Sequence, residues 1–295
     1  MPILVGTASW TDKTLIESGA FYPPGCRTAE ARLRYYAGVF SIVEVDSSYY
    51  GIPTAANSAL WAERTPPGFV FDVKAFRLFT GHQTDPQCLP KDIQAALPKS
   101  DKKNLYYKDV PAPIIDELWA RFFAALQPLK AAGKLGSILF QFPHWVTAAP
   151  KSMAHVEHCA QHMQPFLTAF EFRHESWFDD KHRESTLRME RGLGVVHVIV
   201  DAPEGVSNRA HTIWEATSPQ LAIVRLHGRN AQSWSGASSA AERFNYEYDR
   251  DELSQLAPAI KDISTRVART HVLFNNCYRD VAQRNALSMI EILSS

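Results

Sequence analysis

Polar and charged side chains stand at the ends of the strand-like segments of this chain, and within each segment they keep a spacing of two residues. The members of this set are Glu44, Asp46, Asp72, Lys74, Gln141, Glu171, Arg173, His197, Asp201, Arg225, His227 and Asn275. In a strand, residues i and i+2 point to the same face. Strands buried on both faces are nearly continuous apolar runs, so charges inside them need a reason. If the strands close into a barrel, these groups point inward near one mouth, where we expect the chemistry.

The cationic members of this set favour an anionic ligand. Arg225, His227 and Arg229 alternate along one strand end, and Arg173 follows another strand. Guanidinium groups bind phosphate or carboxylate through paired hydrogen bonds. We therefore predict a small phosphorylated or otherwise anionic molecule as the partner. The predicted binding residues are Lys74, Arg173, Arg225, Arg229, Gln141, Asp201, Asn275, Trp10 and Trp177.

His227 is the predicted acid or base, because its side chain titrates in the range suited to proton transfer. Glu44 or Glu171 would orient it, which predicts a hydrolase or an isomerase rather than a redox enzyme. Two other interpretations remain open. The charged set could consist of ion pairs that only stabilise the barrel, since a buried charge normally has a partner. It could also form a non-catalytic site for an anionic ligand.

A glycosidase is a further alternative, with Glu44 and Glu171 as its carboxylate pair and Trp10, Trp177 and Trp234 stacking on a sugar ring. Against it, we expect the neighbouring arginines to lower the pKa of both carboxyl groups. A general acid needs a raised pKa instead.

Single-stranded or damaged nucleic acid is another candidate ligand, because aromatic side chains near the same mouth could stack on bases. These aromatic residues are Tyr49, Tyr50, Tyr246 and Tyr248. The composition gives this prediction little support. Lys plus Arg and Asp plus Glu each number 31, so the formal net charge is zero and the chain has no overall basic field.

No cofactor is predicted from motifs. The first strand runs into Gly6-Thr7-Ala8-Ser9-Trp10 rather than the glycine-rich GxGxxG loop of dinucleotide-binding proteins. The metal-binding patterns HxH and HExxH are also absent from the sequence. A metal bound by Glu44, Glu171, Asp201 and His227 is not favoured, because lysine and arginine already supply positive charge there.

The bulk composition indicates a globular protein of the cytoplasm. The chain has 295 residues, of which 45% are hydrophobic and 21% charged. We find no apolar stretch of membrane-spanning length and no signal-peptide pattern at the N-terminus, so we expect no membrane association. Four scattered cysteines are typical of reduced thiols. The sequence gives no prediction of oligomeric state.

Eight apolar runs of strand length alternate with helix-like segments. The predicted strands span 3–7, 42–45, 69–74, 135–140, 169–172, 195–200, 221–226 and 271–274. The predicted helices span 28–36, 57–64, 111–130, 152–163, 181–191, 249–263 and 280–293. Asp249 and Glu252 form a capping box for the helix that ends at Ile263. This order predicts an α/β fold, a single TIM-like (β/α)8 barrel domain over residues 1–295, with an open doubly wound sheet as the alternative.

Two connections are unusually long, residues 75–110 after the third strand and 228–248 after the seventh. Loops of this length are usually functional or disordered. Both follow strands, so we expect both at the C-terminal mouth of the barrel, where active sites of this fold lie. A lid formed by 75–110 is one hypothesis.

Seven short blocks of the sequence resemble, in order, the signature blocks of the YecE-like family, also called domain of unknown function 72. They begin with GTASW at Gly6, VEVDSSYY at Val43, FDVKA at Phe71, LFQFP at Leu139, EFRHESW at Glu171, RLHGR at Arg225 and FNN at Phe274. The blocks span nearly the whole chain. The resemblance implies a single TIM barrel, and it implies no particular reaction.

Overall fold

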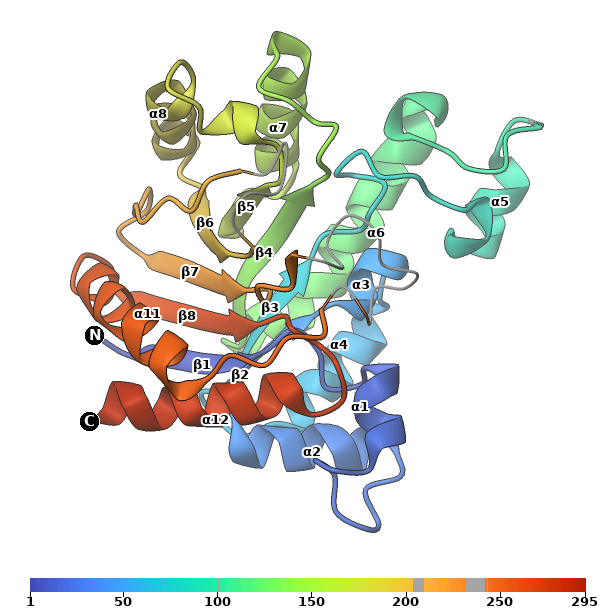
Figure 1. Cartoon of the computed structure of the whole chain (residues 1–295). Coiled ribbons are helices and arrows are strands. Elements are labelled where there is room, and N and C mark those ends of the chain that lie inside the picture. The colour runs from blue at the N-terminus through green and yellow to red at the C-terminus, as the bar shows by residue number, and fades with distance from the viewer. Residues whose placement is uncertain (100, 204–209, 232–241, 243) are drawn as a thin grey trace.

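Eight parallel strands close into a barrel in chain order, as predicted (Figure 1). The computed structural model describes residues 1–99, 101–203, 210–231, 242 and 244–295. The strands are β1 (Ile3–Thr7), β2 (Ile42–Val45), β3 (Val70–Lys74), β4 (Leu135–Phe142), β5 (Thr168–Phe172), β6 (Val196–Asp201), β7 (Leu221–Leu226) and β8 (Arg269–Phe274). The register pairs β1 with both β2 and β8, which closes the sheet. All carboxyl ends of the strands therefore surround one mouth.

The helices predicted from periodicity are present. They are α2 (Ala29–Val39), α4 (Ala55–Glu63), α6 (Ala112–Ala131), α7 (Pro150–His162), α8 (Arg183–Leu193), α11 (Arg250–Ser264) and α12 (Val281–Ser294). Three short helices were not predicted, because they are too brief to show a periodic apolar face, namely α1 (Lys13–Ser18), α3 (Ser47–Tyr50) and α5 (Lys91–Ala96). Within the described chain, none of these helices combines the length and apolar character that a membrane-crossing segment needs.

The interior of the barrel has an apolar layer beneath the charged strand ends. Nine buried residues form it, namely Ile42, Val70, Leu139, Ala169, Val196, Val198, Leu221, Ile223 and Leu273. Several of them stand two positions before a charged residue of the same strand, as Ile42 precedes Glu44 and Ile223 precedes Arg225. Since that spacing keeps side chains on one face, the charged groups stack directly above this layer. A larger apolar cluster packs the helices against the outside of the barrel.

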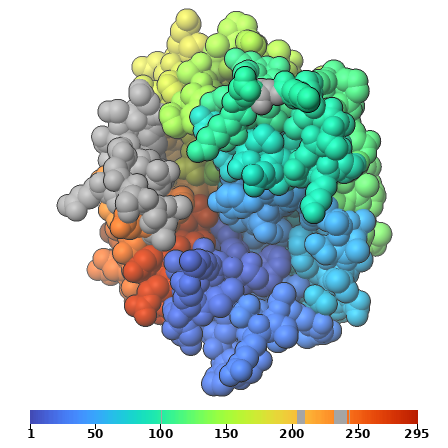
Figure 2. Space-filling view, turned by 90° about the vertical axis from the view of Figure 1, so that its right-hand side faces the viewer, coloured from blue at the N-terminus to red at the C-terminus, as the bar shows by residue number. Residues whose placement is uncertain are grey.

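The long connection after β3 is an ordered excursion with its own apolar contacts. It contains α5 and two short 3-10 turns, and a β-bridge joins Thr84 to Leu105. Phe76, Phe79 and Ile93 are buried within it. In Figure 1 the excursion projects beside α6, and in Figure 2 it forms, in teal, part of the face that carries the mouth. The sequence predicted no helix or strand within this connection, because frequent prolines and polar residues obscure short elements.

The connection after β7 is described only at its two ends. Residues 232–241 and 243 lie outside the described residues, and so does Trp234, which the sequence analysis offered as a sugar-stacking residue. At the described ends, the Asn230 side chain donates to the backbone oxygen of Asn245, at 3.0 Å. Arg229 contacts Glu252 of α11.

The capping box that opens α11 is confirmed and provides a first testable prediction. The Asp249 side chain accepts from the Glu252 backbone N–H at 2.8 Å, and the Glu252 side chain accepts from the Asp249 N–H at 3.1 Å. We expect Asp249→Ala to lower the free energy of unfolding by about 1 kcal/mol, because it leaves a helix N–H unpaired. Urea denaturation measures this loss. Asp251→Ala is the control, since it removes a charge from the same turn without touching the cap, and an equal loss in both variants would contradict the prediction.

Candidate functional site

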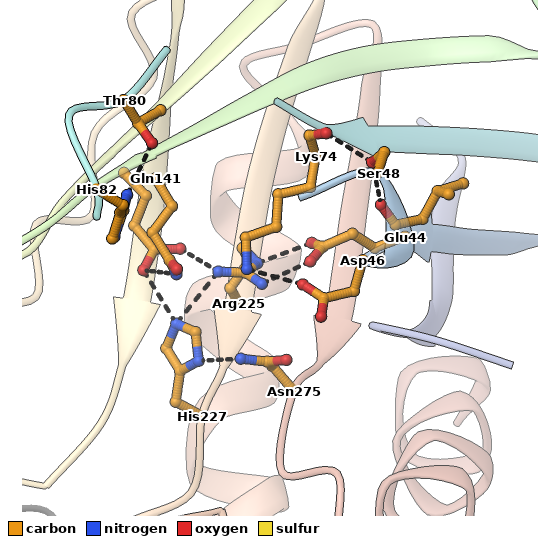
Figure 3. A network of polar contacts seen from close by, with 12 residues as sticks. Glu44, Asp46, Ser48, Lys74, Thr80, His82, Gln141, Arg225, His227 and Asn275 are labelled. Atoms are coloured by element: carbon orange, nitrogen blue, oxygen red, sulfur yellow. Dashed lines mark hydrogen bonds and ion pairs between the residues drawn. The ribbon is translucent and has the colours of Figure 1, made fainter. Parts of the chain in front are cut away.

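A fully buried arginine of β7 lies at the centre of the charged layer (Figure 3). Arg225 Nε and Nη2 donate to the two carboxylate oxygens of Glu44 at 2.9 and 2.6 Å. Its Nη1 donates to Glu171 Oε2. Arg225 therefore links β2, β5 and β7 across the barrel. Neither carboxylate nor the guanidinium is exposed to solvent.

His227 lies two residues after Arg225, just beyond the carboxyl end of β7. Its Nδ1 lies 2.7 Å from the side-chain nitrogen of Asn275, which follows β8. Its Nε2 lies 3.3 Å from Glu171 Oε1 and 3.4 Å from Arg173 Nη2. With the Asn275 amide donating to Nδ1, a neutral ring carries its proton on Nε2, toward Glu171. The predicted cluster of His227, Glu171, Arg173, Arg225 and Asn275 is thus assembled at one place.

The pKa values of the two buried glutamates, Glu44 and Glu171, are shifted in opposite directions. Burial alone would raise the pKa of the Glu171 carboxyl, but the charges of Arg173 and Arg225 and the contact with His227 outweigh it and hold the pKa well below its usual value. Burial raises the pKa of the Glu44 carboxyl, and Arg225 and Lys74 oppose that shift without cancelling it. The expectation of two lowered pKa values was therefore wrong for Glu44, where burial outweighs Arg225. Among the described residues, Glu171 contacts two arginines and Glu44 contacts one.

The imidazole of His227 is held neutral. Burial, followed by the charge of Arg173, lowers its pKa from 6.5 to about 3, although Glu171 acts in the opposite direction. A positive group beside a histidine disfavours a second positive charge. At neutral pH the ring is therefore a neutral hydrogen-bonding group whose basicity depends on the charge of Arg173.

An outer layer of polar side chains, formed by Lys74, Asp46, Arg173 and Gln141, lies between the Arg225 cluster and the mouth of the barrel. Lys74 of β3 contacts Asp46 Oδ1 at 2.7 Å, and its ammonium lies 4.5 Å from the centre of the Tyr49 ring. The Arg173 Nε contacts Glu171 Oε1 at 2.5 Å, and 19% of the Arg173 side chain is exposed. Gln141 donates to the same Glu171 oxygen at 2.8 Å. Of the cations around Glu171, Arg173 is thus the one that reaches solvent.

The excursion after β3 adds Arg77 and His82 to this outer layer. The Arg77 guanidinium lies 5.1 Å from the centre of the Tyr49 ring. His82 contacts Thr80 Oγ1 at 2.8 Å through Nδ1. Burial and the charges of Lys74, Arg77 and Arg173 lower the pKa of His82 to about 3. The two-residue spacing cannot identify such residues, because it applies only within a strand and these residues lie in the connection that follows β3.

Asp201 and Arg229 form a separate cluster, contrary to the sequence prediction. Arg229 Nη2 contacts Asp201 Oδ1 at 2.8 Å, and the Tyr248 hydroxyl donates to Asp201 Oδ2 at 2.6 Å. Val198 and Val200 of β6 pack with the barrel interior, so Asp201 lies on the opposite face of that strand. Likewise His197 contacts Glu190 of α8 at 3.3 Å, on the outside of the barrel. The prediction that the side chains of His197 and Asp201 point into the barrel was therefore wrong.

The two predicted tryptophans pack into the apolar core. Trp177 is fully buried and stacks on Phe172, with ring centres 4.0 Å apart. Its indole N–H donates to the Val146 backbone oxygen. Trp10 is 6% exposed and contacts Phe71 edge to face. We therefore leave both out of the binding site proposed below.

Asp72 belongs to a smaller polar group deeper in the barrel. It accepts from Ser137 Oγ at 2.9 Å, and its other oxygen lies 2.8 Å from His271 Nδ1. Asp72 was predicted at the mouth, and His271 was not predicted as its partner, because His271 lies in the first half of β8, away from the strand end. Only closure of the barrel brings β3 and β8 within contact. Among the described residues, no group of three or more histidine, cysteine, aspartate or glutamate side chains is arranged to hold a metal ion.

Comparisons with known proteins agree with the barrel. The chain is similar to the UPF0759 protein YunF of Bacillus subtilis, with 31% identity over 99% of this chain and 94% of that protein. The structure is similar to a crystal structure of a DUF72 family protein from Thermotoga maritima, with a TM-score of 0.79 and 29% identity over 100% of both chains. One from Enterococcus faecalis has a TM-score of 0.80 and 24% identity over 99% of this chain and 96% of that one.

The family model described as "Protein of unknown function DUF72" matches residues 4–295, which is nearly the whole chain. It covers the strand ends that carry Glu44, Glu171, Arg225 and His227. The chain therefore belongs to the DUF72 family.

Proposed function

We propose that the mouth of the barrel binds a small phosphorylated or otherwise anionic molecule, and that the site belongs to a hydrolase or an isomerase. Lys74 and Arg173 would hold the anion, since both lie in the outer layer. Arg225 would not touch it, because Glu44 and Glu171 already occupy its guanidinium. In this proposal Arg225 positions the two carboxylates instead.

The observation that carries the proposal is the positive surrounding of His82 at the mouth. The Lys74 ammonium and the Arg77 guanidinium lie 4.5 and 5.1 Å from the centre of the Tyr49 ring, which is next to His82, and the charges of Lys74, Arg77 and Arg173 lower the pKa of His82. The carboxylates Glu44 and Glu171 lie deeper, bound to Arg225. Lys74 pairs with Asp46 and Arg173 with Glu171, so a small anion beside these two cations would compensate the further positive charge that Arg77 adds.

Binding of an anion would also prepare His227 for proton transfer. The charge of Arg173 is the largest electrostatic contribution to the low pKa of His227. An anion that pairs with Arg173 offsets that charge, so the pKa of His227 rises toward neutrality. Because Arg173 Nη2 lies 3.4 Å from His227 Nε2, an anion that draws Arg173 outward would open a path to that nitrogen. Once the ring is protonated, His227 would act as the acid through its Nε2–H, with the Asn275 amide turned so that its oxygen accepts from Nδ1–H.

The alternatives receive less support from the geometry. A glycosidase needs two carboxyl groups that face its substrate, whereas Glu44 and Glu171 share one buried guanidinium. The raised pKa of Glu44 and lowered pKa of Glu171 fit an acid and its partner, but neither side chain is exposed. A non-catalytic anion-binding barrel stays the second candidate, because it needs the same outer cations and no proton transfer.

Titration calorimetry with inorganic phosphate tests the binding step. We expect Arg173→Gln to weaken phosphate binding roughly tenfold to a hundredfold, because it removes a charge-assisted hydrogen bond. Arg229→Gln is the matched control, since Arg229 pairs with Asp201 and Glu252 in the separate cluster. Its phosphate affinity should remain that of the original chain.

Two results would contradict this proposal. One is absence of phosphate binding by the original chain, and the other is an equal loss of affinity in both variants. Because Arg173 also contacts Glu171, thermal unfolding of each variant must accompany the titration. Lys74→Met gives a second variant in the same outer layer if Arg173→Gln fails to fold.

A further inference from the structure

A row of aromatic rings runs along the mouth, beside the outer cations. Tyr50 and Tyr49 lie in α3, and their ring centres are 5.0 Å apart. Tyr49 lies 5.2 Å from His82, and His82 lies 5.7 Å from Trp145. His144 closes the row, 4.8 Å from Trp145. These residues follow β2, β3 and β4, so the row crosses the carboxyl ends of three neighbouring strands.

Two large aromatic side chains of the row are exposed to solvent, which is unusual. Tyr50 is 54% exposed and Trp145 is 48% exposed. The indole N–H of Trp145 donates to the Gly81 backbone oxygen at 3.3 Å. This contact fixes the ring against the excursion and leaves mainly its carbon atoms toward solvent. An exposed ring held in place by its polar atom is suited to stacking.

We propose that this aromatic row is a subsite for a planar ring carried by the anionic ligand, so that the ligand resembles a nucleoside monophosphate. The inference rests on the anion site proposed above and extends it by naming the class of ligand. Tyr49 joins the two parts, because Lys74 and Arg77 both lie against its ring. A phosphate between Lys74 and Arg173 would therefore lie next to the row.

Two polar atoms of the row, Trp145 Nε1 and His82 Nδ1, already have protein partners, which favours an aromatic ring over a sugar as the group bound there. A sugar on an aromatic platform usually needs side-chain partners for its hydroxyl groups. Here the Trp145 N–H contacts Gly81, and His82 Nδ1 contacts Thr80. The exposed ring of Trp145 therefore offers mainly its carbon atoms, and base–aromatic stacking requires little else. The zero net charge of the chain favours a small molecule over a nucleic acid strand.

Three probes of equal charge type separate the parts of this proposal: inorganic phosphate, glucose 6-phosphate and adenosine 5′-monophosphate. Calorimetry on the original chain should show that the adenosine compound binds more tightly than the other two. In Trp145→Leu, we expect its affinity to fall about tenfold, within the range for loss of one stacked ring. The affinity for inorganic phosphate should stay within about twofold of the original. Leu287→Ala, which alters an exposed apolar side chain of α12, is the control.

The outcomes distinguish this inference from the function on which it depends. Equal affinities for all three probes, with phosphate binding sensitive to Arg173→Gln, would overturn the ring subsite and leave the anion site standing. Preference for glucose 6-phosphate, lost in Trp145→Leu, would replace the planar ring by a sugar and overturn the inference as stated. Failure of all three probes to bind would overturn both proposals.

Discussion

Replacement of Arg225 by methionine should lower the free energy of unfolding by about 3–5 kcal/mol, because it leaves two carboxylates buried without their shared partner. Glu44 and Glu171 are fully buried, and Arg225 donates to both. Methionine nearly fills the space of the arginine stem, so the loss reports the missing charge rather than a cavity. Urea denaturation at pH 7 measures it.

The control is Arg229→Met, which removes an arginine of the same strand end from a partly exposed pair. Its cost should be about 1 kcal/mol or less, as for other solvent-accessible ion pairs. Adding Glu44→Gln to Arg225→Met should recover part of the stability, since a neutral amide tolerates burial better than an unpaired carboxylate, whereas Glu171 keeps Arg173 as its partner. An Arg225→Met variant as stable as Arg229→Met would show that Arg225 does not hold the charged layer together.

The pH dependence of the Arg225→Met variant identifies the cause of the loss. Without the guanidinium, burial raises the pKa of the Glu44 carboxyl further above the unfolded-state value of about 4.3, whereas Glu171 keeps its contact with Arg173. An acid with a raised pKa in the folded state contributes stability at low pH and loses it as the pH rises through that pKa. The deficit relative to the original chain should therefore shrink from pH 7 to pH 4.5.

Acidification of the original chain should cost about 2–3 kcal/mol at pH 4.5 through His227 alone. The pKa of this histidine is about 3 in the folded protein, against an ordinary value of 6.5. Each unit of difference corresponds to about 1.4 kcal/mol once the pH lies between the two values. Because the unfolded chain takes up the proton first, stability is complete above pH 6.5 and falls as the pH decreases toward 3.

His227→Gln removes this titration while keeping a side chain that can hydrogen-bond to Asn275. We expect the loss of stability between pH 7 and pH 4.5 to be about 2 kcal/mol smaller in this variant than in the original chain. His82 has a pKa lowered to the same extent, so part of the acid sensitivity should remain. His211→Gln, at an exposed position, is the control for removing one imidazole. Identical pH profiles for the original chain and His227→Gln would rule out the buried neutral ring.

The sequence by itself determined the barrel and the core of its site. Period-two spacing selects Glu44, Glu171, Arg225 and His227 because a strand returns to the same face every second residue. Parallel order then gathers these strand ends at one mouth. The eight strands were placed within two residues of their observed bounds for the same reason, since fully buried strands are continuous apolar runs.

Only the tertiary structure decided which charges pair and which groups remain within reach of a ligand. Asp201 and Arg229 followed the same spacing as the others, yet Asp201 faces the outside of β6 and draws Arg229 away. Arg225 and Arg173 look equivalent in sequence, but one is closed off by two carboxylates and the other reaches solvent. Arg77, His82 and Trp145 join the mouth through chain beyond the strand ends. Burial and pairing depend on side chains far apart in sequence, so no local pattern encodes them.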